Sequence, residues 1–237
     1  MAKIAYLIDE LQLGPYQVLA LTFSNKAGRE MRERVSTEVS ANVGALQVTT
    51  FHSFCARILR NEAEYIGLSR NFTIYDSSES KAIAKQILSR HGISTKEFSP
   101  FEILYFVADL KNNGYYPERN EEFIDCEIEK DDDFYQYYME YEAELHKANA
   151  VDFGGLISGV IQLFEKYPDV LKRYQERFRY VLVDEYQDTN RAQFQLLKML
   201  CEKRKNICVV GDEDQSIYSW RGADIRNILD FEEVFPK

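Results

Sequence analysis

Residues 180–190 read Tyr-Val-Leu-Val-Asp-Glu-Tyr-Gln-Asp-Thr-Asn, and this stretch decides the fold. Its apolar start is typical of a buried parallel strand that is covered on both faces. The strand ends at two adjacent carboxylates, Asp184 and Glu185, and ligands of open α/β sheets bind at the carboxyl ends of strands. The pattern predicts a site where Asp184 holds Mg²⁺ through water and Glu185 takes a proton from an attacking water. The alternative is a solvated turn, where paired acids are common.

The composition indicates a globular protein. Of its 237 residues 45% are apolar, enough for one large or two modest domains. No apolar run approaches the roughly 20 residues of a membrane span, and the first residues, Met-Ala-Lys-Ile-Ala-Tyr-Leu-Ile, turn polar too soon for a signal peptide. The four cysteines form no C-x-x-C pair and the three histidines are scattered, so no zinc site is expected. We therefore expect a cytoplasmic protein with reduced thiols and no membrane partner.

The net charge of −10 argues at first against a nucleic-acid partner. Most of this charge lies in residues 118–133, which hold nine acidic residues and only two basic ones, Arg119 and Lys130. Such a run is typical of a solvated loop. Basic side chains gather elsewhere, at Lys26, Arg29, Arg32, Arg34, Arg57 and Arg60. Global charge is therefore a poor guide to the local surface.

Strand and helix patterns alternate in the first part of the chain. Residues 3–13 predict a helix that buries one face, formed by Ile4, Leu7, Ile8 and Leu11. Residues 18–23 predict a strand, followed by an N-cap at Ser24-Asn25 and a helix with apolar positions every four residues. Residues 46–50 predict a second strand, with a turn at 51–53 and then a helix.

The last part of the chain has the same order. The acidic strand is followed by a helix with an apolar face of Phe194, Leu197 and Leu200, and residues 206–210 predict a further strand. Strands that alternate with helices form βαβ units. The sequence therefore predicts an α/β fold with a parallel sheet.

The middle of the chain differs. Capping boxes at Asp76 and Ser99 open two helices, and Gly114 is placed to end the second. Apolar and aromatic positions in 134–145 predict a third helix, and no strand pattern is found between about 76 and 150. We expect a helical subdomain inserted into the parallel-sheet domain.

Residues 209–223 carry a second informative stretch. Gln215 follows a predicted strand, where an uncharged amide can meet a γ-phosphate. Tyr218, Trp220 and Arg221 suit the stacking of unpaired bases and contact with a nucleic-acid backbone. The alternative is a core tryptophan with a neighbouring arginine.

Five stretches together resemble the UvrD/Rep/PcrA-type superfamily 1 DNA helicases. Residues 183–190 and 211–223 resemble motifs II and III of that family, 21–31 resemble motif Ia, and 50–54 resemble motif Ib. Residues 150–156, Ala-Val-Asp-Phe-Gly-Gly-Leu, are similar to the stretch where the chain returns from a helical insertion.

The resemblance implies a RecA-like sheet of the P-loop NTPase fold, in residues 1–70 and 151–237, with an inserted all-helical subdomain in 71–150. It implies part of an ATP-dependent 3′-to-5′ DNA helicase, which couples ATP hydrolysis with Mg²⁺ to translocation on single-stranded DNA and duplex unwinding. The implied partners are single-stranded DNA and 3′-tailed duplex DNA. Repair and replication are both compatible with such an enzyme.

The resemblance also implies roles for individual residues. Asp184 would coordinate Mg²⁺, Glu185 would activate water, and Gln215 would couple the γ-phosphate to DNA. Tyr218 and Trp220 would stack on bases, with Arg221 linking that site to Gln215. The remaining implied DNA contacts are Phe23 and Asn25 on the strand, and Thr50, His52 and Ser53 on its phosphates.

The chain departs from the family pattern in one respect. It contains no G-x-x-x-x-G-K-[ST] loop, whose amides and lysine hold the β- and γ-phosphates. From the resemblance we expect that the strand that feeds this loop and the second motor domain are also missing. We therefore expect a fragment that does not hydrolyse ATP by itself. One alternative is a non-catalytic remnant that binds single-stranded DNA or a partner. Another is the motor subunit of a helicase–nuclease.

Overall fold

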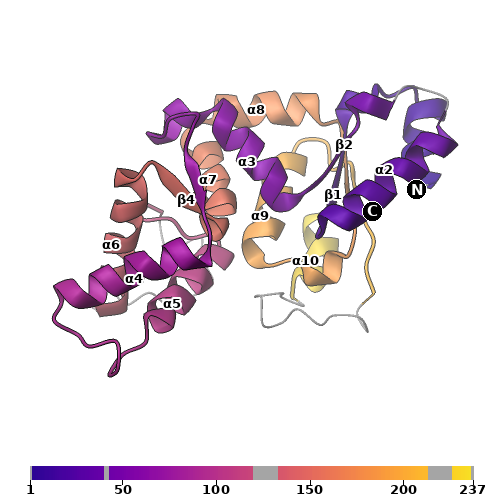
Figure 1. Ribbon diagram of the computed structural model, residues 1–237. Coiled ribbons are helices and arrows are strands. Elements are labelled where there is room, and N and C mark those ends of the chain that lie inside the picture. Colours follow the sequence, from indigo (N-terminus) through magenta and orange to yellow (C-terminus); the bar gives the residue numbers. More distant parts are fainter. Residues whose placement is uncertain (1, 40–42, 120–132, 213–225, 236–237) are drawn as a thin grey trace. The chain divides into compact units, whose positions relative to one another are not determined.

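The computed structural model describes residues 2–39, 43–119, 133–212 and 226–235 (Figure 1). The chain divides into two compact units, Met1–Phe54 with Phe164–Lys237, here called the sheet unit, and Cys55–Leu163, here called the helical unit. The two divisions fall within helices α3 and α7. The domain limits expected from the sequence, at 70/71 and 150/151, stay a prediction.

Four parallel strands form the sheet of the first unit. They are β1 (Val18–Thr22), β2 (Gln47–Thr50), β5 (Tyr180–Val183) and β6 (Ile207–Val209), in the order β2-β1-β5-β6. Val183 lies opposite Leu21 on one side and opposite Val209 on the other. The structure thus confirms the predicted α/β fold with a parallel sheet, and the carboxyl ends of all four strands lie at the same end of the sheet.

The helices of the sheet unit lie between and around these strands. They are α1 (Ala2–Ala5), which continues as the π-helical η1 (Tyr6–Glu10), α2 (Asn25–Glu38), the start of α3 (Phe51–Asn61), α8 (Pro168–Arg177), α9 (Arg191–Cys201) and α10 (Arg226–Val234). Short 3₁₀ turns are η2 (Pro15–Gln17), η3 (Val43–Ala45) and η6 (Tyr186–Asp188). No helix that the structure describes, in either unit, has both the length and the apolar character to cross a membrane.

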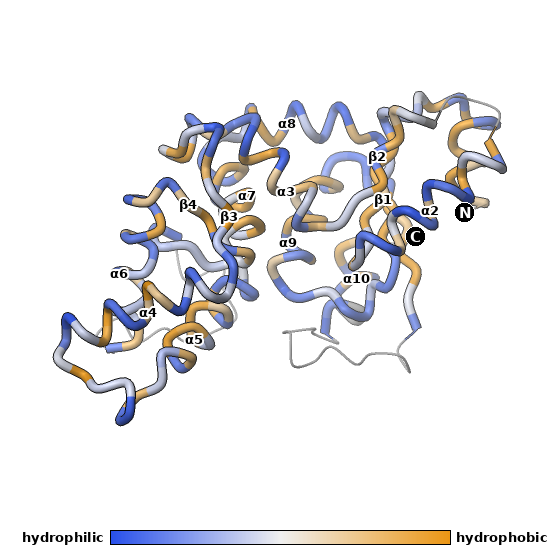
Figure 2. Tube along the Cα trace, in the orientation of Figure 1, coloured by the Kyte–Doolittle hydropathy of each residue, from blue (hydrophilic) through white to orange (hydrophobic). Residues whose placement is uncertain are grey.

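The core of this unit forms around β1, which is buried along its whole length and hydrophobic over its first four residues (Figure 2). Val18 and Ala20 pack in one cluster with residues of α1, α2 and β2, and Leu19 and Leu21 point to the opposite face. The predicted N-cap is confirmed, because the Ser24 hydroxyl accepts a hydrogen bond from the Ala27 amide at 3.1 Å.

Two local predictions are wrong. Residues 51–53 form the first turn of α3 instead of a loop, because the Thr50 hydroxyl accepts the Ser53 amide at 3.2 Å and so caps the helix directly at the strand end. Leu11 does not continue the buried face of the first helix. The helix ends at Glu10, and Leu11 is 52% exposed.

The prediction that β5 is covered on both faces is also wrong. Val181 and Val183 are buried, whereas Tyr180 and Leu182, on the opposite face, are only partly buried. Tyr180 and Leu182 lie on the face where α1 and α2 pack over β1 and β2. Coverage on that face is incomplete at β5, which leaves room for a pocket beside the strand end.

The helical unit contains α4 (Ser77–Arg90), α5 (Pro100–Asn112), α6 (Asp133–Lys147), most of α7 (Phe153–Lys166) and the 3₁₀ turn η4 (Ala63–Ile66). The capping boxes at Asp76 and Ser99 are confirmed, and α5 ends just before Gly114, which has φ +80°. A short parallel pair, β3 (Thr73–Tyr75) with β4 (Ala150–Asp152), adds to the expected helices. Strands of three residues are too short for a periodic pattern to predict them.

A buried ion cluster joins α5, α6 and the start of α7. The Lys111 ammonium is 2% exposed and lies 2.8 Å from Asp152 Oδ1 and 2.5 Å from Glu142 Oε1. Asp152 also accepts hydrogen bonds from the Tyr141 hydroxyl and the Gly155 amide. Burial acts to raise the pKa of Asp152, but the nearby Lys111 charge outweighs it and holds that pKa below its usual range.

Replacing Lys111 tests this cluster. Lys111→Met would leave the buried Asp152 and the partly buried Glu142 without their cation, so we expect the free energy of unfolding in urea to fall by about 3–5 kcal/mol. Lys85→Met, at an exposed position on α4, is the control and should change it little. Equal unfolding free energies for the two variants would contradict the prediction.

Candidate active site

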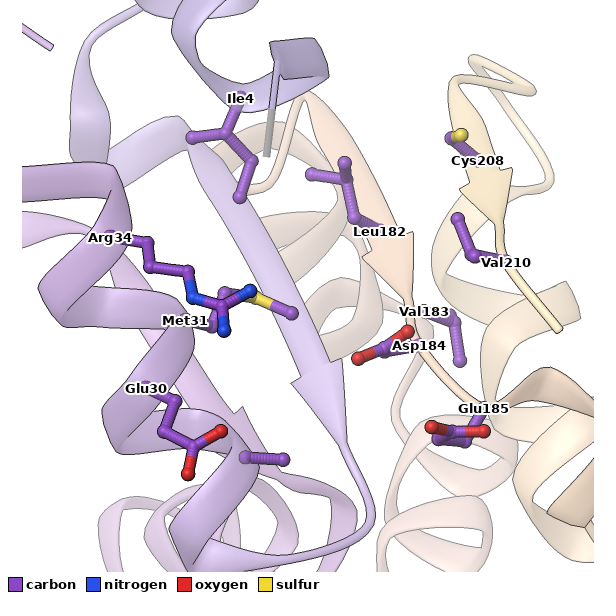
Figure 3. Close-up of a pocket in the computed structure, with 11 residues that line it drawn as sticks. Ile4, Glu30, Met31, Arg34, Leu182, Val183, Asp184, Glu185, Cys208 and Val210 are labelled. Atoms are coloured by element: carbon purple, nitrogen blue, oxygen red, sulfur yellow. The ribbon is translucent and has the colours of Figure 1, made fainter. Parts of the chain in front are cut away.

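A pocket of about 330 Å³ lies at the carboxyl ends of β5 and β6 (Figure 3). Asp184 and Glu185 line it from the end of β5, and Cys208 and Val210 line it from β6 and the residues just after it. Side chains of α2 form the facing wall, namely Ala27, Glu30, Met31 and Arg34. Figure 3 shows Arg34 extending from α2 toward Asp184. The structure therefore brings the two predicted acids to the edge of an open pocket.

Asp184 is held by the sheet itself. Its amide donates to the Leu21 carbonyl at 3.0 Å, which continues the β1–β5 ladder one residue past the strand. The side chain is partly buried, and burial together with the Glu185 charge raises the pKa of the Asp184 carboxyl. The surroundings of Asp184 in the folded chain therefore disfavour the charged form of its carboxyl group.

Glu185 has an unusual backbone for a residue with a side chain. Its φ of 51° and ψ of 44° lie in the left-handed region, a conformation that costs about 1–3 kcal/mol for such residues and often occurs at functional sites. The left-handed residue starts η6 and turns the chain sharply after β5. The Glu185 carboxylate is thereby exposed at the pocket edge.

The turn that follows Glu185 is anchored to α10. Asn227 is fully buried, and its side-chain amide donates to the Thr189 carbonyl at 2.8 Å. The Tyr186 hydroxyl donates to the Asn227 carbonyl at 3.0 Å, and Arg191 pairs with Asp230 at 2.6 Å. The turn that carries the acids is therefore held by α10 as well as by the sheet.

A third acid, Asp188, lies in this turn. Burial raises the pKa of its carboxyl, and the Glu185 charge raises it further. The position of Asp188 follows from η6, where its amide donates to the Glu185 carbonyl at 2.9 Å. The turn thus brings three acidic residues close together in the sequence, and the Glu185 charge raises the pKa of the other two.

The predicted DNA-contact residues at β1 and β2 come together at the carboxyl end of the sheet. Thr22 lies opposite Thr50 in the ladder, so the residues that follow each strand are neighbours. The Phe23 ring packs on Phe51 with 5.7 Å between centroids, and Asn25 is the exposed first residue of α2. The Thr50 hydroxyl lies 2.9 Å from Ser53 Oγ, and His52 is partly buried in the same helical turn. Contact of these five residues with DNA stays a prediction.

The remaining predicted site residues, Gln215, Tyr218, Trp220 and Arg221, lie outside the described residues.

The sequence patterns gave no site role to three residues that lie near the acids. Arg34 and Glu30 line the pocket. They follow Ala27 at helical spacing, and that spacing is the signal that could have found them. Gln187 is 3% exposed and donates to the Glu185 carboxylate at 2.7 Å. A polar residue two positions after a predicted base gives no signal of burial by itself.

Comparison with known proteins shows the family to which the chain is related. A model of the UvrD/REP helicase N-terminal domain matches residues 1–236. The chain is 47% identical over 239 aligned residues to the ATP-dependent DNA helicase PcrA of Staphylococcus aureus, with 99% of this chain and 32% of the relative covered. It is 46% identical, with the same coverage, to the ATP-dependent DNA helicase PcrA of Staphylococcus epidermidis. The chain thus spans about a third of the length of these relatives.

The raised pKa of Asp184 gives a prediction for stability. Because burial and Glu185 raise the folded-state pKa above the ordinary 3.8, the ionised carboxylate destabilises the folded chain at neutral pH. Asp184→Asn should therefore increase the free energy of unfolding at pH 7. The gain should shrink as the pH falls through the raised pKa and vanish below 3.8. Urea unfolding at several pH values measures it.

Glu33→Gln, at an exposed position of α2, is the matched control and should show no such gain. An Asp184→Asn chain that is less stable than the parent at pH 7 would contradict the prediction.

Proposed function

The chain belongs to the UvrD/REP helicase family, and from this premise we propose that it forms the first motor domain of an ATP-dependent DNA helicase. In the proposal the intact enzyme couples ATP hydrolysis to 3′-to-5′ movement on single-stranded DNA and unwinds 3′-tailed duplexes, in the cytoplasm. The observation that carries it is the pair Asp184 and Glu185 at the end of β5, facing an open pocket.

The chemistry of the pocket fits the proposed use of ATP and Mg²⁺. Mg²⁺ prefers oxygen ligands and retains several waters, which suits a partly buried carboxylate such as Asp184. When bound, the ion would neutralise charge on the phosphates. Glu185 is exposed and adjacent, so it can accept a proton from a water that attacks the γ-phosphate. Arg34, across the pocket, is a cation that can meet phosphate oxygens.

The DNA strand is proposed to cross the ends of β1 and β2. Phe23 offers a ring for base stacking, and Asn25, Thr50, His52 and Ser53 offer polar groups for the backbone. The ladder pairing of Thr22 with Thr50 supports this path, because it sets the two groups side by side. Gln215, Tyr218, Trp220 and Arg221 are assigned to the same function by sequence alone.

A second candidate is a non-catalytic module that binds single-stranded DNA or a partner. It is favoured by one feature of the sequence, since the 237 residues contain no G-x-x-x-x-G-K-[ST] loop. The acids at the end of β5 favour the first candidate, because DNA binding by itself does not need an exposed base beside a charge-repelled Asp184.

We expect the isolated chain to show no ATP hydrolysis above background. Without P-loop amides and lysine, the β- and γ-phosphates are not held in line with the attacking water. A single-turnover assay with Mg²⁺ and radiolabelled ATP measures this. Hydrolysis that requires Mg²⁺ and disappears in Glu185→Gln would contradict the expectation, whereas hydrolysis that persists in Glu185→Gln comes from a contaminant.

Both candidate functions include the binding of single-stranded DNA, and a titration tests this property. The chain has one tryptophan, Trp220, so its fluorescence reports on that position during titration with oligothymidine at low salt, where backbone contacts are strongest. We expect saturable quenching, which is absent in a folded Trp220→Phe chain. No quenching in a folded parent chain would contradict the DNA-binding assignment of Trp220.

The same titration examines Phe23. Loss of a stacking ring typically costs about 1–3 kcal/mol of binding, so Phe23→Ala should weaken the affinity accordingly. Tyr65→Ala removes an exposed aromatic side chain from the helical unit and is the matched control. Equal affinities for the two variants, both folded by circular dichroism, would remove Phe23 from the DNA path.

A further inference from the structure

Gln187 is a buried amide in the turn after β5, and it bridges two elements of the site. Its Nε2 lies 2.7 Å from Glu185 Oε2, and its Oε1 lies 3.1 Å from the amide nitrogen of Asp212, just after β6. We propose that Gln187 is a positioning residue, which holds the Glu185 carboxylate in place relative to the end of β6. The inference rests on the proposed function, in which Glu185 activates water.

The orientation of the Gln187 amide follows from its partners. A backbone N–H can only donate, so the group that faces Asp212 N must be the oxygen Oε1. The Nε2 group then faces Glu185, and an ionised carboxylate can only accept. Both ends of the amide are therefore matched, and the hydrogen bond to Glu185 is assisted by the carboxylate charge.

Glu185 needs such a restraint because, within the described part of the chain, no second hydrogen bond or ion pair holds its side chain. The side chain is exposed and has several rotatable bonds, while its left-handed backbone sends it away from the ordinary strand direction. A general base works only within hydrogen-bond reach of the proton that it removes. One directed bond from a buried neighbour restricts the carboxylate to one region of the pocket edge.

The strand end of β6 is shaped to admit Gln187. A Cβ added at Gly211 would lie 2.5 Å from Gln187 Oε1 and 3.2 and 3.3 Å from the amide nitrogens of Gln187 and Tyr186. The Tyr186 amide donates to the Val210 carbonyl at 2.9 Å, and the Val210 amide donates to Val183 at 2.9 Å. The β5–β6 ladder thus continues past both strands, and the Gln187 oxygen takes the place of the next backbone carbonyl.

This arrangement makes the Glu185 position depend on the backbone at Asp212. A shift of Asp212 moves the Gln187 oxygen, and the opposite end of the same planar amide carries the bond to Glu185. A second buried glutamine of the sheet unit, Gln175, offers a comparison without this link. It is 4% exposed, and its Nε2 donates to the Met199 carbonyl at 2.7 Å.

Nuclear magnetic resonance of the ¹⁵N-glutamine-labelled chain tests the contact directly. The Gln187 side-chain amide is identified by its loss in Gln187→Leu, and the Gln175 amide by its loss in Gln175→Leu. We expect the Gln187 resonance to exchange slowly with solvent and to shift in Glu185→Ala, while the Gln175 resonance stays in place. A Gln187 resonance that does not respond to Glu185→Ala in a folded chain would overturn the proposal.

Kinetics of the intact helicase test the role of the contact. Gln187→Leu should lower kcat for ATP hydrolysis by roughly tenfold to a hundredfold, through misplacement of the base, with KM for ATP nearly unchanged. Gln175→Leu loses a comparable buried hydrogen bond and should change neither constant. An unchanged kcat in folded Gln187→Leu overturns the positioning role. Absence of hydrolysis by the parent enzyme would instead reject the proposed function, and the resonance experiment would still decide the contact.

Discussion

The parallel pairing of β5 with β1 on one side and β6 on the other is the constraint on which the site depends. The ladder sets Val183 opposite Leu21 and Val209, so the next residue, Asp184, must emerge at the sheet edge where all strands end. Backbone bonds extend the ladder past the strands on both sides, from Asp184 to Leu21 and from Val210 to Val183. The position of the acids is therefore set by main-chain hydrogen bonds, which substitutions of side chains on the surface do not disturb.

The turn after β5 contains residues that lower the stability of the folded chain and that carry the chemistry of the proposed site. It carries a left-handed Glu185 and two acids, Asp184 and Asp188, whose pKa values are raised by burial and by the Glu185 charge. Such a turn persists only because neighbouring groups determine its shape. Asn227 holds it from α10, and Gln187 holds it from the end of β6. Natural proteins commonly keep strained, charge-repelled residues only where function requires them.

The helical unit is organised around a buried charge. The Lys111 ammonium is buried among the chain segments that close this unit, and Asp152 both pairs with it and accepts the Gly155 amide at the start of α7. The two glycines after Phe153 are needed for this packing. A Cβ at Gly155 would lie 2.8 Å from Asp152 Oδ1, and one at Gly154 would lie 3.0 Å from the Lys111 side chain. The Asp-Phe-Gly-Gly stretch therefore has a packing reason as well as a family resemblance.

The sequence by itself determined the elements that rest on local physics. Strand periodicity, the caps at Ser24, Asp76 and Ser99, and the acids after an apolar strand all depend on neighbours within a few residues, and they predicted the parallel α/β fold and the pair Asp184 and Glu185. Tertiary structure decided what depends on distant neighbours. The partial exposure of Leu182, the pocket wall at Arg34 and the burial of Gln187 follow from how α2 and the end of β6 pack beside β5. These contacts join residues far apart in the chain, so no local pattern records them.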